Sequence, residues 1–456
     1  MGALLSCVVT GTTFCFCSAC SSLLGACCGN DKPSTIPPSV TSGRKRSVFL
    51  MVIALGLALA FQYGIAPWLV DNKDYTGFIS ENWLDGCEQY ENQDLRESCA
   101  GNSGVYRVSA SAVVFFALAA VAVVLKPTFN REVWPAKYVL FFMLCAVTIF
   151  IPNEPLFADI FLNVARVGGV LFILLQQIII IDMAYDWNDS WVAKADAAES
   201  EEMGSGKNWL GAILFSAFSM FALAIAGLVV MYIHFTGCTS NDAFIIATTV
   251  FMILITVIQL SGEEGNILSS AAVSLWATFL CYTAVAKNPD DTCNPQYGEQ
   301  DRLGLALSII VLIISMCWTG WSYTAEDKLM GSQEAEEHAE QRSSNNGEGR
   351  KVAGVVTGDY GTHNDDEPDE GEDDEAGNNP NILSNSWKLN VMLASITCWM
   401  AMALTSWGEI SANGEAANAQ VGRVGMWIII GSQWLVLSLY LWTMAAPRLF
   451  PDRDFN

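Results

Sequence analysis

The residues best suited to chemistry are four polar side chains inside one long apolar segment. They are Arg166, Gln176, Gln177 and Asp182, within residues 156–183. Polar groups in a membrane cost free energy and usually face protein or a water-filled path. Arg166 and Gln177 lie about three helical turns apart, so a helix places them on one face, while Asp182 points elsewhere. Their partners must come from other segments, and the candidates are Glu263, Glu264, Glu409 and Arg423. Two interpretations stay open: a path for a polar group, and hydrogen bonds that hold helices together.

The end of the same segment, IDMAYDWNDSWV, combines acids with indoles. Asp182, Asp186 and Asp189 recur on one helical face, and Trp187 and Trp191 occupy the neighbouring stripe. Like charges at this spacing destabilise a helix, whereas tryptophans at a membrane surface anchor it. Residues 156–192 contain no proline, so we predict one helix of roughly 50 Å that is longer than the bilayer core and tilts or projects into the cytosol. A weak cation or head-group contact at the aspartates is the second interpretation.

Catalytic chemistry finds little support in the sequence. The chain has three histidines, two of them in a strongly acidic loop, and it lacks nucleotide-binding and nucleophile-elbow motifs. The pair Gly168-Gly169 is better explained by close packing of helices. We therefore predict that the protein is not an enzyme and has no catalytic residue, cofactor or metal site.

Composition and hydropathy predict a polytopic, all-α membrane protein. Of the 456 residues, 52% are hydrophobic and 15% are charged, against about 25% charged in soluble domains. Apolar segments near the length that spans a bilayer recur along most of the chain. We predict ten membrane helices, at residues 48–70, 108–125, 136–152, 156–183, 209–236, 242–261, 267–286, 303–323, 387–411 and 424–446.

Lysine and arginine alternate between the two sides of this arrangement. Sixteen lie on the side of the N-terminus and five on the opposite side, while Arg166 and Arg423 lie in or at the edge of spans. The positive-inside rule then places both termini in the cytosol.

Four cysteines outside the N-terminal leader and the spans all fall on the non-cytosolic side, where disulfides persist. Three pairings are possible. We prefer Cys87 with Cys99, which share the loop 71–107, and Cys238 with Cys293, which lie at neighbouring loop mouths.

Two polar regions flank or interrupt the helices. The leader, residues 1–46, is a candidate for an extra membrane segment or for acylation, at Gly2, Cys7, Cys15, Cys17, Cys20, Cys27 and Cys28. Helices one to eight occupy 47–324, and the last two with the tail occupy 387–456. Between them, residues 325–386 hold 17 acids against four basic residues, which predicts a disordered cytosolic loop. That charge excludes nucleic acid as a partner and leaves sorting or lipid-synthesis proteins as candidate partners.

The box at 181–192 resembles the I-D-F-A-H-x-W-N-E-x-W-V signature of the serine incorporator (Serinc) family. The signature residues carried over are Asp182, Trp187, Asn188 and Trp191, and Gln176 also fits. Further matches are Val105-Tyr106-Arg107, Phe150-Ile151-Pro152, Cys293-Asn294-Pro295 and Tyr440-Leu441-Trp442-Thr443. The resemblance implies ten transmembrane helices in two bundles bridged by a long diagonal fourth helix.

The resemblance also implies delivery of serine for phosphatidylserine and sphingolipid synthesis and, for some members, ATP-independent phospholipid scrambling. The partners would be membrane phospholipids and serine, in an endomembrane or the plasma membrane. Two alternatives are a secondary carrier of a small polar solute and a scaffold that recruits lipid-synthesis enzymes without transporting anything.

Overall fold

The computed structural model describes residues 40–72, 77–126, 129, 133–201, 205–261, 266–299, 301–318, 380–412 and 415–449. The candidate acylation sites from Gly2 to Cys28, residues 325–379 of the acidic loop, Glu263 and Glu264 lie outside the described residues. The prediction for the end of that loop, 380–386, is wrong, because these residues form the start of a helix that runs from Pro380 to Leu404.

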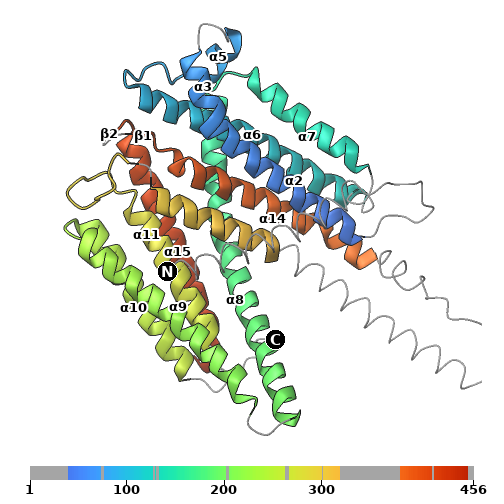
Figure 1. The fold of residues 1–456 in the computed structure, drawn as a ribbon, viewed down its shortest axis with the longest axis vertical. Helices are drawn as coiled ribbons and strands as arrows, with labels where there is room; N and C mark the ends of the chain where they lie inside the picture. Colours follow the sequence, from blue (N-terminus) through green and yellow to red (C-terminus); the bar gives the residue numbers. More distant parts are fainter. Residues whose placement is uncertain are drawn as a thin grey trace, which may run out of the picture. The chain divides into compact units, whose positions relative to one another are not determined.

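The described chain is almost entirely helical (Figure 1). Its elements are α2 (Val40–Ala60), η1 (Phe61–Ile65), α3 (Ala66–Asp71), α5 (Phe78–Trp83), α6 (Gln93–Leu125), α7 (Trp134–Ile149), η3 (Leu156–Phe161), α8 (Leu162–Glu201), α9 (Lys207–His234), α10 (Thr239–Leu260), α11 (Ile267–Val285), the helix Arg302–Trp318, α14 (Pro380–Leu404), η4 (Ser406–Gly408) and α15 (Ala419–Leu449). Two short antiparallel strands, β1 (Ser411–Ala412) and β2 (Glu415–Ala416), form the connection before α15.

Eight of the described helical segments are long and apolar enough to cross a membrane, and two shorter apolar helices, α7 and Arg302–Trp318, accompany them. Each of the ten predicted spans coincides with one of these ten segments. The predicted fold class, an all-α polytopic membrane protein, is therefore confirmed.

The chain divides into two compact units. The first comprises Met1–Leu50, Ala117–Tyr138 and Thr319–Val391, and the second comprises Met51–Phe116, Val139–Trp318 and Met392–Asn456. In the first unit Tyr138 makes edge contact with Phe49 and a tilted contact with Trp134. The ammonium of Lys137 lies 4.6 Å from the Trp134 ring centroid and donates to the Phe129 carbonyl. All sites discussed below belong to the second unit.

Helix α11 is the centre of the second unit, where it packs against α8, α9, α10 and α15. Figure 1 shows α9, α10 and α11 side by side. Small residues at Ser270, Ala271, Ser274 and Ala277 are buried and allow neighbouring helices to approach closely. Asn266 caps the helix by accepting hydrogen bonds from the first backbone N–H groups. Close packing of these small residues thus explains why α11, which carries several serines, lies at the centre of the second unit.

Helix α8 is one uninterrupted helix of 40 residues, which corresponds to roughly 60 Å at 1.5 Å per residue. The predicted long helix is confirmed and continues past residue 192. Gly168 allows close packing, because a Cβ there would lie 2.4 Å from the Cys398 sulfur of α14. Farther along, Trp191 contacts both Trp187 and Trp209 of α9. One helix therefore packs against α14 with its first half and against α9 with its second.

Both predicted disulfides are present, and the pairing preferred from the sequence is confirmed. Cys87 is bonded to Cys99 inside the loop 71–107. Cys238 is bonded to Cys293, which ties the start of α10 to the segment after α11.

Arg107 is a fully buried cation that joins two segments of the second unit to α6. Its guanidinium donates to the carbonyl group of Asn82 in α5 and to those of Thr148 and Ile151 at the end of α7. Its Cζ lies 4.7 Å from the centroid of the Phe157 ring and 5.1 Å from that of Trp83, close enough for cation–π attraction. The role of this residue is structural.

We expect Arg107→Ala to lower the free energy of unfolding by about 3 kcal/mol or more, because each carbonyl left without a donor costs about 1–3 kcal/mol. The unfolding midpoint, followed by tryptophan fluorescence of the purified protein, measures this. Arg423→Ala, at an exposed site, is the control. Equal midpoints for the two variants would contradict the structural role of Arg107.

Candidate functional site

Two of the four polar residues predicted in α8 bind the same neighbouring helix. The Ser315 hydroxyl donates to Gln176 Oε1 at 2.6 Å, and the Trp318 indole donates to Asp182 Oδ2 at 3.3 Å. Both partners lie on the helix Arg302–Trp318. The observed partner of Asp182, Trp318, was not among the candidates named from the sequence. Gln176 and Asp182 therefore join helices, as the architectural interpretation predicted.

Gln177 is the immediate neighbour of Gln176 but, unlike Gln176, has no hydrogen-bond partner among the described residues. Only 4% of its surface is exposed. Neither the Nε2 nor the Oε1 atom has a hydrogen-bond partner among the described residues. An amide buried in this way costs about 1–3 kcal/mol judged from protein variants, so it requires an explanation other than stability.

Arg166 lies in the first turns of α8, on the same face as Gln177. Its guanidinium donates to the Trp407 carbonyl at 3.2 Å and to Asn163 Oδ1 at 3.3 Å. Its Nε atom is buried and has no partner among the described residues. Glu409, a predicted partner, binds elsewhere. Of the candidate partners, Glu409 is therefore not the one that Arg166 contacts, and the main-chain carbonyl of Trp407 accepts its hydrogen bond instead.

A cavity of about 290 Å³ lies beside Arg166, and we call it the Arg166 pocket. Glu154 and Asp159 supply negative charge to its wall, and its polar lining also includes Asn102, Asn153, Tyr106, Asn163 and Asn418. Asp159 lies in η3, a π-helical turn that precedes α8, and such turns are frequent at functional sites. A pocket with a guanidinium and carboxylates on its walls can hold a small group that carries both signs of charge.

The turn that supplies the Trp407 carbonyl has an unusual backbone. Ser406, Trp407 and Gly408 all have positive φ, a conformation that residues other than glycine rarely adopt. A Cβ at Gly408 would also lie 2.9 Å from the Leu162 side chain. Asn418 accepts from the backbone N–H of Ile410 and donates to the Gly408 carbonyl, which holds the turn in place.

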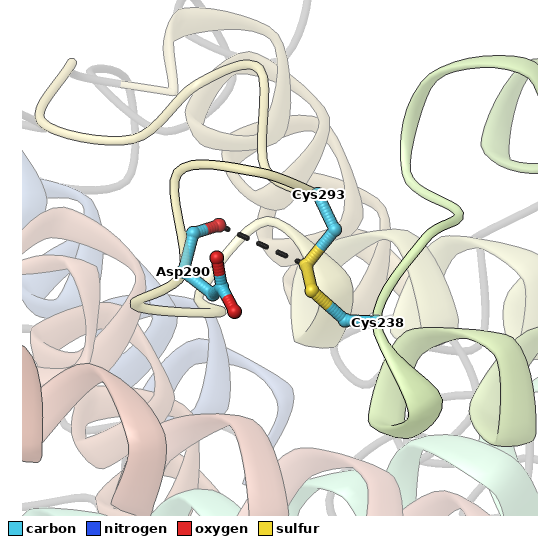
Figure 2. Close-up of side chains that lie close together, drawn as sticks. All are labelled: Cys238, Asp290 and Cys293. Carbon is cyan, nitrogen blue, oxygen red and sulfur yellow. Dashed lines mark hydrogen bonds between the residues drawn. A yellow bond between two sulfur atoms is a disulfide. The ribbon is translucent and has the colours of Figure 1, made fainter.

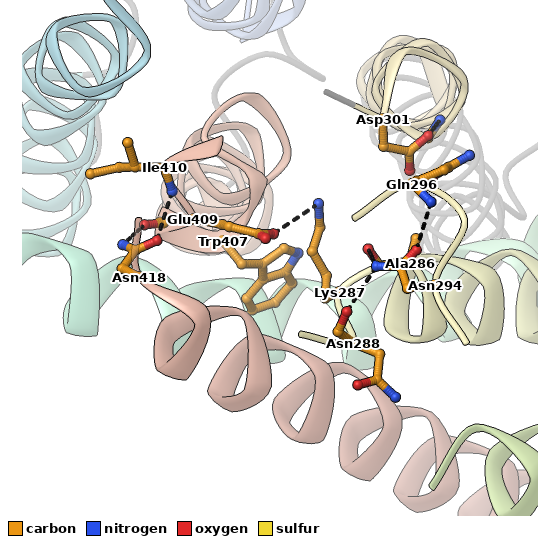
Figure 3. Close-up of polar contacts among 12 residues, drawn as sticks. Ala286, Lys287, Asn288, Asn294, Gln296, Asp301, Trp407, Glu409, Ile410 and Asn418 are labelled. Carbon is orange, nitrogen blue, oxygen red and sulfur yellow. Dashed lines mark hydrogen bonds and ion pairs between the residues drawn. The ribbon is translucent and has the colours of Figure 1, made fainter. Parts of the chain in front are cut away.

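Glu409 forms a buried ion pair with Lys287, which the sequence did not single out (Figure 3). The Nζ and Oε2 atoms are 3.7 Å apart, and the two side chains are 7% and 10% exposed. Lys287 follows α11 directly, and its position in the sequence indicated only an outer-side charge. Burial raises the pKa of Glu409 above its ordinary value, and the ammonium of Lys287 partly offsets that rise.

An asparagine network fixes the segment that carries Lys287. Asn288 donates to Asn241 Oδ1 at 2.8 Å, and Asn241 donates to the Phe235 carbonyl at the end of α9. Asn294 donates to the carbonyl groups of Ala286 and Asn288, and Figure 3 shows it beside Ala286. Together with the Cys238–Cys293 disulfide, these bonds attach the segment to the α9–α10 connection.

Within the described ranges, one group of side chains has the spacing of a metal site: Cys238, Asp290 and Cys293. Figure 2 shows that the two sulfur atoms are bonded to each other, so they provide no thiolate to a metal. Asp290 instead accepts from the backbone N–H and the hydroxyl of Thr292, and these bonds lower its pKa. These three residues therefore stabilise the loop through a disulfide and hydrogen bonds.

The remaining predicted residues lie at surfaces. Arg423 is exposed on α15, where it borders an open groove with Trp427. Asp182, Asp186 and Asp189 are exposed, whereas Trp187, Asn188 and Trp191 are half-buried. The tryptophans pack against α9 and one another. The signature box therefore serves mainly as a helix contact.

Comparison with known proteins places this architecture in context. A sequence model described as serine incorporator (Serinc) matches residues 13–453. A probable serine incorporator of Nematostella vectensis is 26% identical over 454 residues, which cover 92% of this chain and 93% of the relative. Serine incorporator 3 of Bos taurus is 26% identical over 489 residues, with 97% of each chain covered. Serine incorporator 2 of Mus musculus is 24% identical over the full length of both chains.

The burial of Glu409, which outweighs its pairing with Lys287, predicts a pH dependence of stability. Because the folded protein raises the pKa of Glu409, stability from this group is fully present below the ordinary glutamate pKa of 4.5 and is lost as pH rises through the raised value. We expect the unfolding midpoint of the wild type to fall relative to that of Glu409→Gln over this window. Thermal unfolding across a pH series measures it.

Glu415→Gln, which changes an exposed acid in the same connection, is the matched control and should follow the wild type. Parallel pH curves for the wild type and Glu409→Gln would exclude this titration.

Proposed function

The chain belongs to the serine incorporator family, and we propose that it moves serine or serine-containing phospholipid head groups across its membrane without catalysing a reaction. The proposal starts from two findings: the chain is a multi-pass membrane protein, and it belongs to this family. The head group would pass along α8 while the acyl chains of a phospholipid stay in the bilayer, so no nucleotide is required. From the distribution of lysine and arginine we further propose that both termini face the cytosol.

One observation carries this proposal. Along a single face of α8, Arg166 and Gln177 keep hydrogen-bonding atoms that are buried and have no partner among the described residues. The protein therefore accepts the free-energy cost of two incompletely bonded groups inside a membrane. A head group that passes between them would supply the missing bonds, which gives these positions a function in transport.

The charges around Arg166 favour a zwitterionic cargo. A carboxylate or phosphate can bind the guanidinium, which recognises both groups in a bidentate manner. An ammonium group can bind Glu154 and Asp159, which also line the Arg166 pocket. Free serine and the phosphatidylserine head group both carry an ammonium and a carboxylate. The pocket therefore also supports the carrier of a small solute as a second candidate function.

Reconstitution into liposomes separates these functions. Fluorescent phosphatidylserine in both leaflets is exposed to a membrane-impermeant quencher, and uptake of labelled serine is measured in the same vesicles. Quenching beyond the outer-leaflet fraction supports scrambling, and saturable uptake supports the carrier. If both signals match those of empty vesicles, the transport proposal fails, and the scaffold remains.

Adjacent glutamines provide a matched pair of variants. Gln177→Leu removes the unpartnered amide, so we expect flux to fall at least severalfold while the unfolding midpoint is kept or raised, because an unsatisfied buried polar group is removed. Gln176→Leu breaks the bond with Ser315, so we expect a lower midpoint and unchanged flux per folded molecule. Flux and unfolding are measured on the same preparations. Unchanged flux in Gln177→Leu would mean that this residue has no part in transport.

A further inference from the structure

A second and larger cavity lies on the outer side of the same unit. Its volume is about 750 Å³, and we call it the Gln62 pocket. The walls come from η1 and α3, the start of α6, the segment before the helix Arg302–Trp318, and strand β1. Binding sites for small molecules usually measure about 300–1,000 Å³. The cavity is therefore large enough for an organic molecule.

The charge on its walls is mainly negative. Asp94, Glu97, Glu299 and Asp301 line the cavity, and Arg302 is the cation among the lining residues. Asp301 is held in one position, because its Oδ1 atom accepts from the Tyr282 hydroxyl at 2.9 Å and from the Gly304 N–H at 2.8 Å. A Cβ at residue 304 would lie 2.0 Å from Asp301 Oδ2, so the glycine leaves room for the carboxylate.

A second feature that points to a ligand is the buried side chain of Gln62, which lines the cavity. It is 9% exposed, and its Nε2 atom donates to the Leu404 carbonyl at 2.7 Å, which fixes the amide. Its Oε1 atom is buried and has no partner among the described residues. The residue lies in the π-helical turn η1 and lines the cavity. An acceptor held in this way requires a hydrogen-bond donor, and the wall contains further acceptors in its carboxylates.

These groups select an ammonium over a metal ion. No three carboxylates of this wall bring oxygen atoms within 4.8 Å of one another, since the one group of that kind in the described chain is the disulfide cluster. Spaced acceptors suit the several N–H bonds of an ammonium group. Tyr63, 48% exposed on the same turn, offers an aromatic face that attracts cations. Arg302 can bind the anionic end of the same molecule.

We propose that the Gln62 pocket binds the ammonium end of a zwitterion, with Arg302 at its anionic end. The ligand is either a free amino acid or the head group of an ammonium-bearing phospholipid, because both present this chemistry. The inference goes beyond the proposed function, since the Gln62 pocket shares no lining residue with the Arg166 pocket named above and binding here requires no transport.

Calorimetric titration of the purified full-length protein tests the proposal. The probes are L-serine, glycerophosphoethanolamine, and glycerophosphoglycerol as the matched compound without an ammonium. We expect saturable binding of at least one ammonium compound and none of glycerophosphoglycerol. Binding of serine identifies a free solute, and binding of glycerophosphoethanolamine alone identifies a lipid head group. Equal binding of glycerophosphoglycerol, or binding of none of the three, would overturn the proposal.

Variants locate the site. Asp94→Asn and Glu97→Gln keep the shape of the wall and remove two charges, so we expect the double variant to weaken binding by roughly tenfold or more. Asp291→Asn, at an exposed outer acid outside the pocket, should bind as the wild type does. Melting curves confirm that each variant is folded. Unchanged affinity in the folded double variant would place the ligand elsewhere and refute the assignment.

Discussion

A polar group that is buried away from water, in lipid or inside the protein, must be bonded by the protein, because its surroundings offer it no other partner. Most buried polar side chains of the second unit obey this constraint. Arg107 donates to three main-chain carbonyl groups, Lys287 pairs with Glu409, and Asn294 bonds two carbonyl groups of one turn. Atoms that have no partner among the described residues are exceptions to this constraint, and they are the positions at which a further role is worth testing.

Within the described part of the chain such atoms also occur elsewhere, for example at Ser269, Ser270 and Ser274 of α11. Two of the places belong to the proposed binding positions. On α8, Arg166 Nε and Gln177 lie on one face of the long helix, and Gln62 Oε1 lies in a π-helical turn at the outer cavity. Each of the two larger polar cavities includes residues of a π-helical turn, η3 in one case and η1 in the other. A π-helical turn displaces the residues that follow it, so it can direct polar side chains toward a cavity while the helix continues through the bilayer. Cys99, which is bonded to Cys87, lines the cavity that includes η3.

The sequence predicted the features that depend on composition and spacing. The ten helical segments follow from apolar runs, the disulfide pairing follows from cysteines that share a loop or lie at neighbouring loop mouths, and the long α8 follows from the absence of a breaker. It could not distinguish Gln176 from Gln177, because that difference depends on whether Ser315 is within reach. It also missed Lys287, whose partner lies more than a hundred residues away across three further helical segments. The sequence indicated a possible cation or head-group contact at the aspartates of the signature box, but the observed helix contacts are made by its tryptophans, which pack against each other and against Trp209 of α9.

The central claim is that Gln177 faces a path that polar molecules enter, whereas Gln176 does not. Single cysteines at the two positions test it directly, with modification by a membrane-impermeant thiol reagent located by mass spectrometry so that native cysteines are counted separately. The account predicts that cysteine at 177 reacts faster than cysteine at 176 and that added serine or phosphatidylserine slows the reaction. Equal protection of the two cysteines in the folded protein would contradict it.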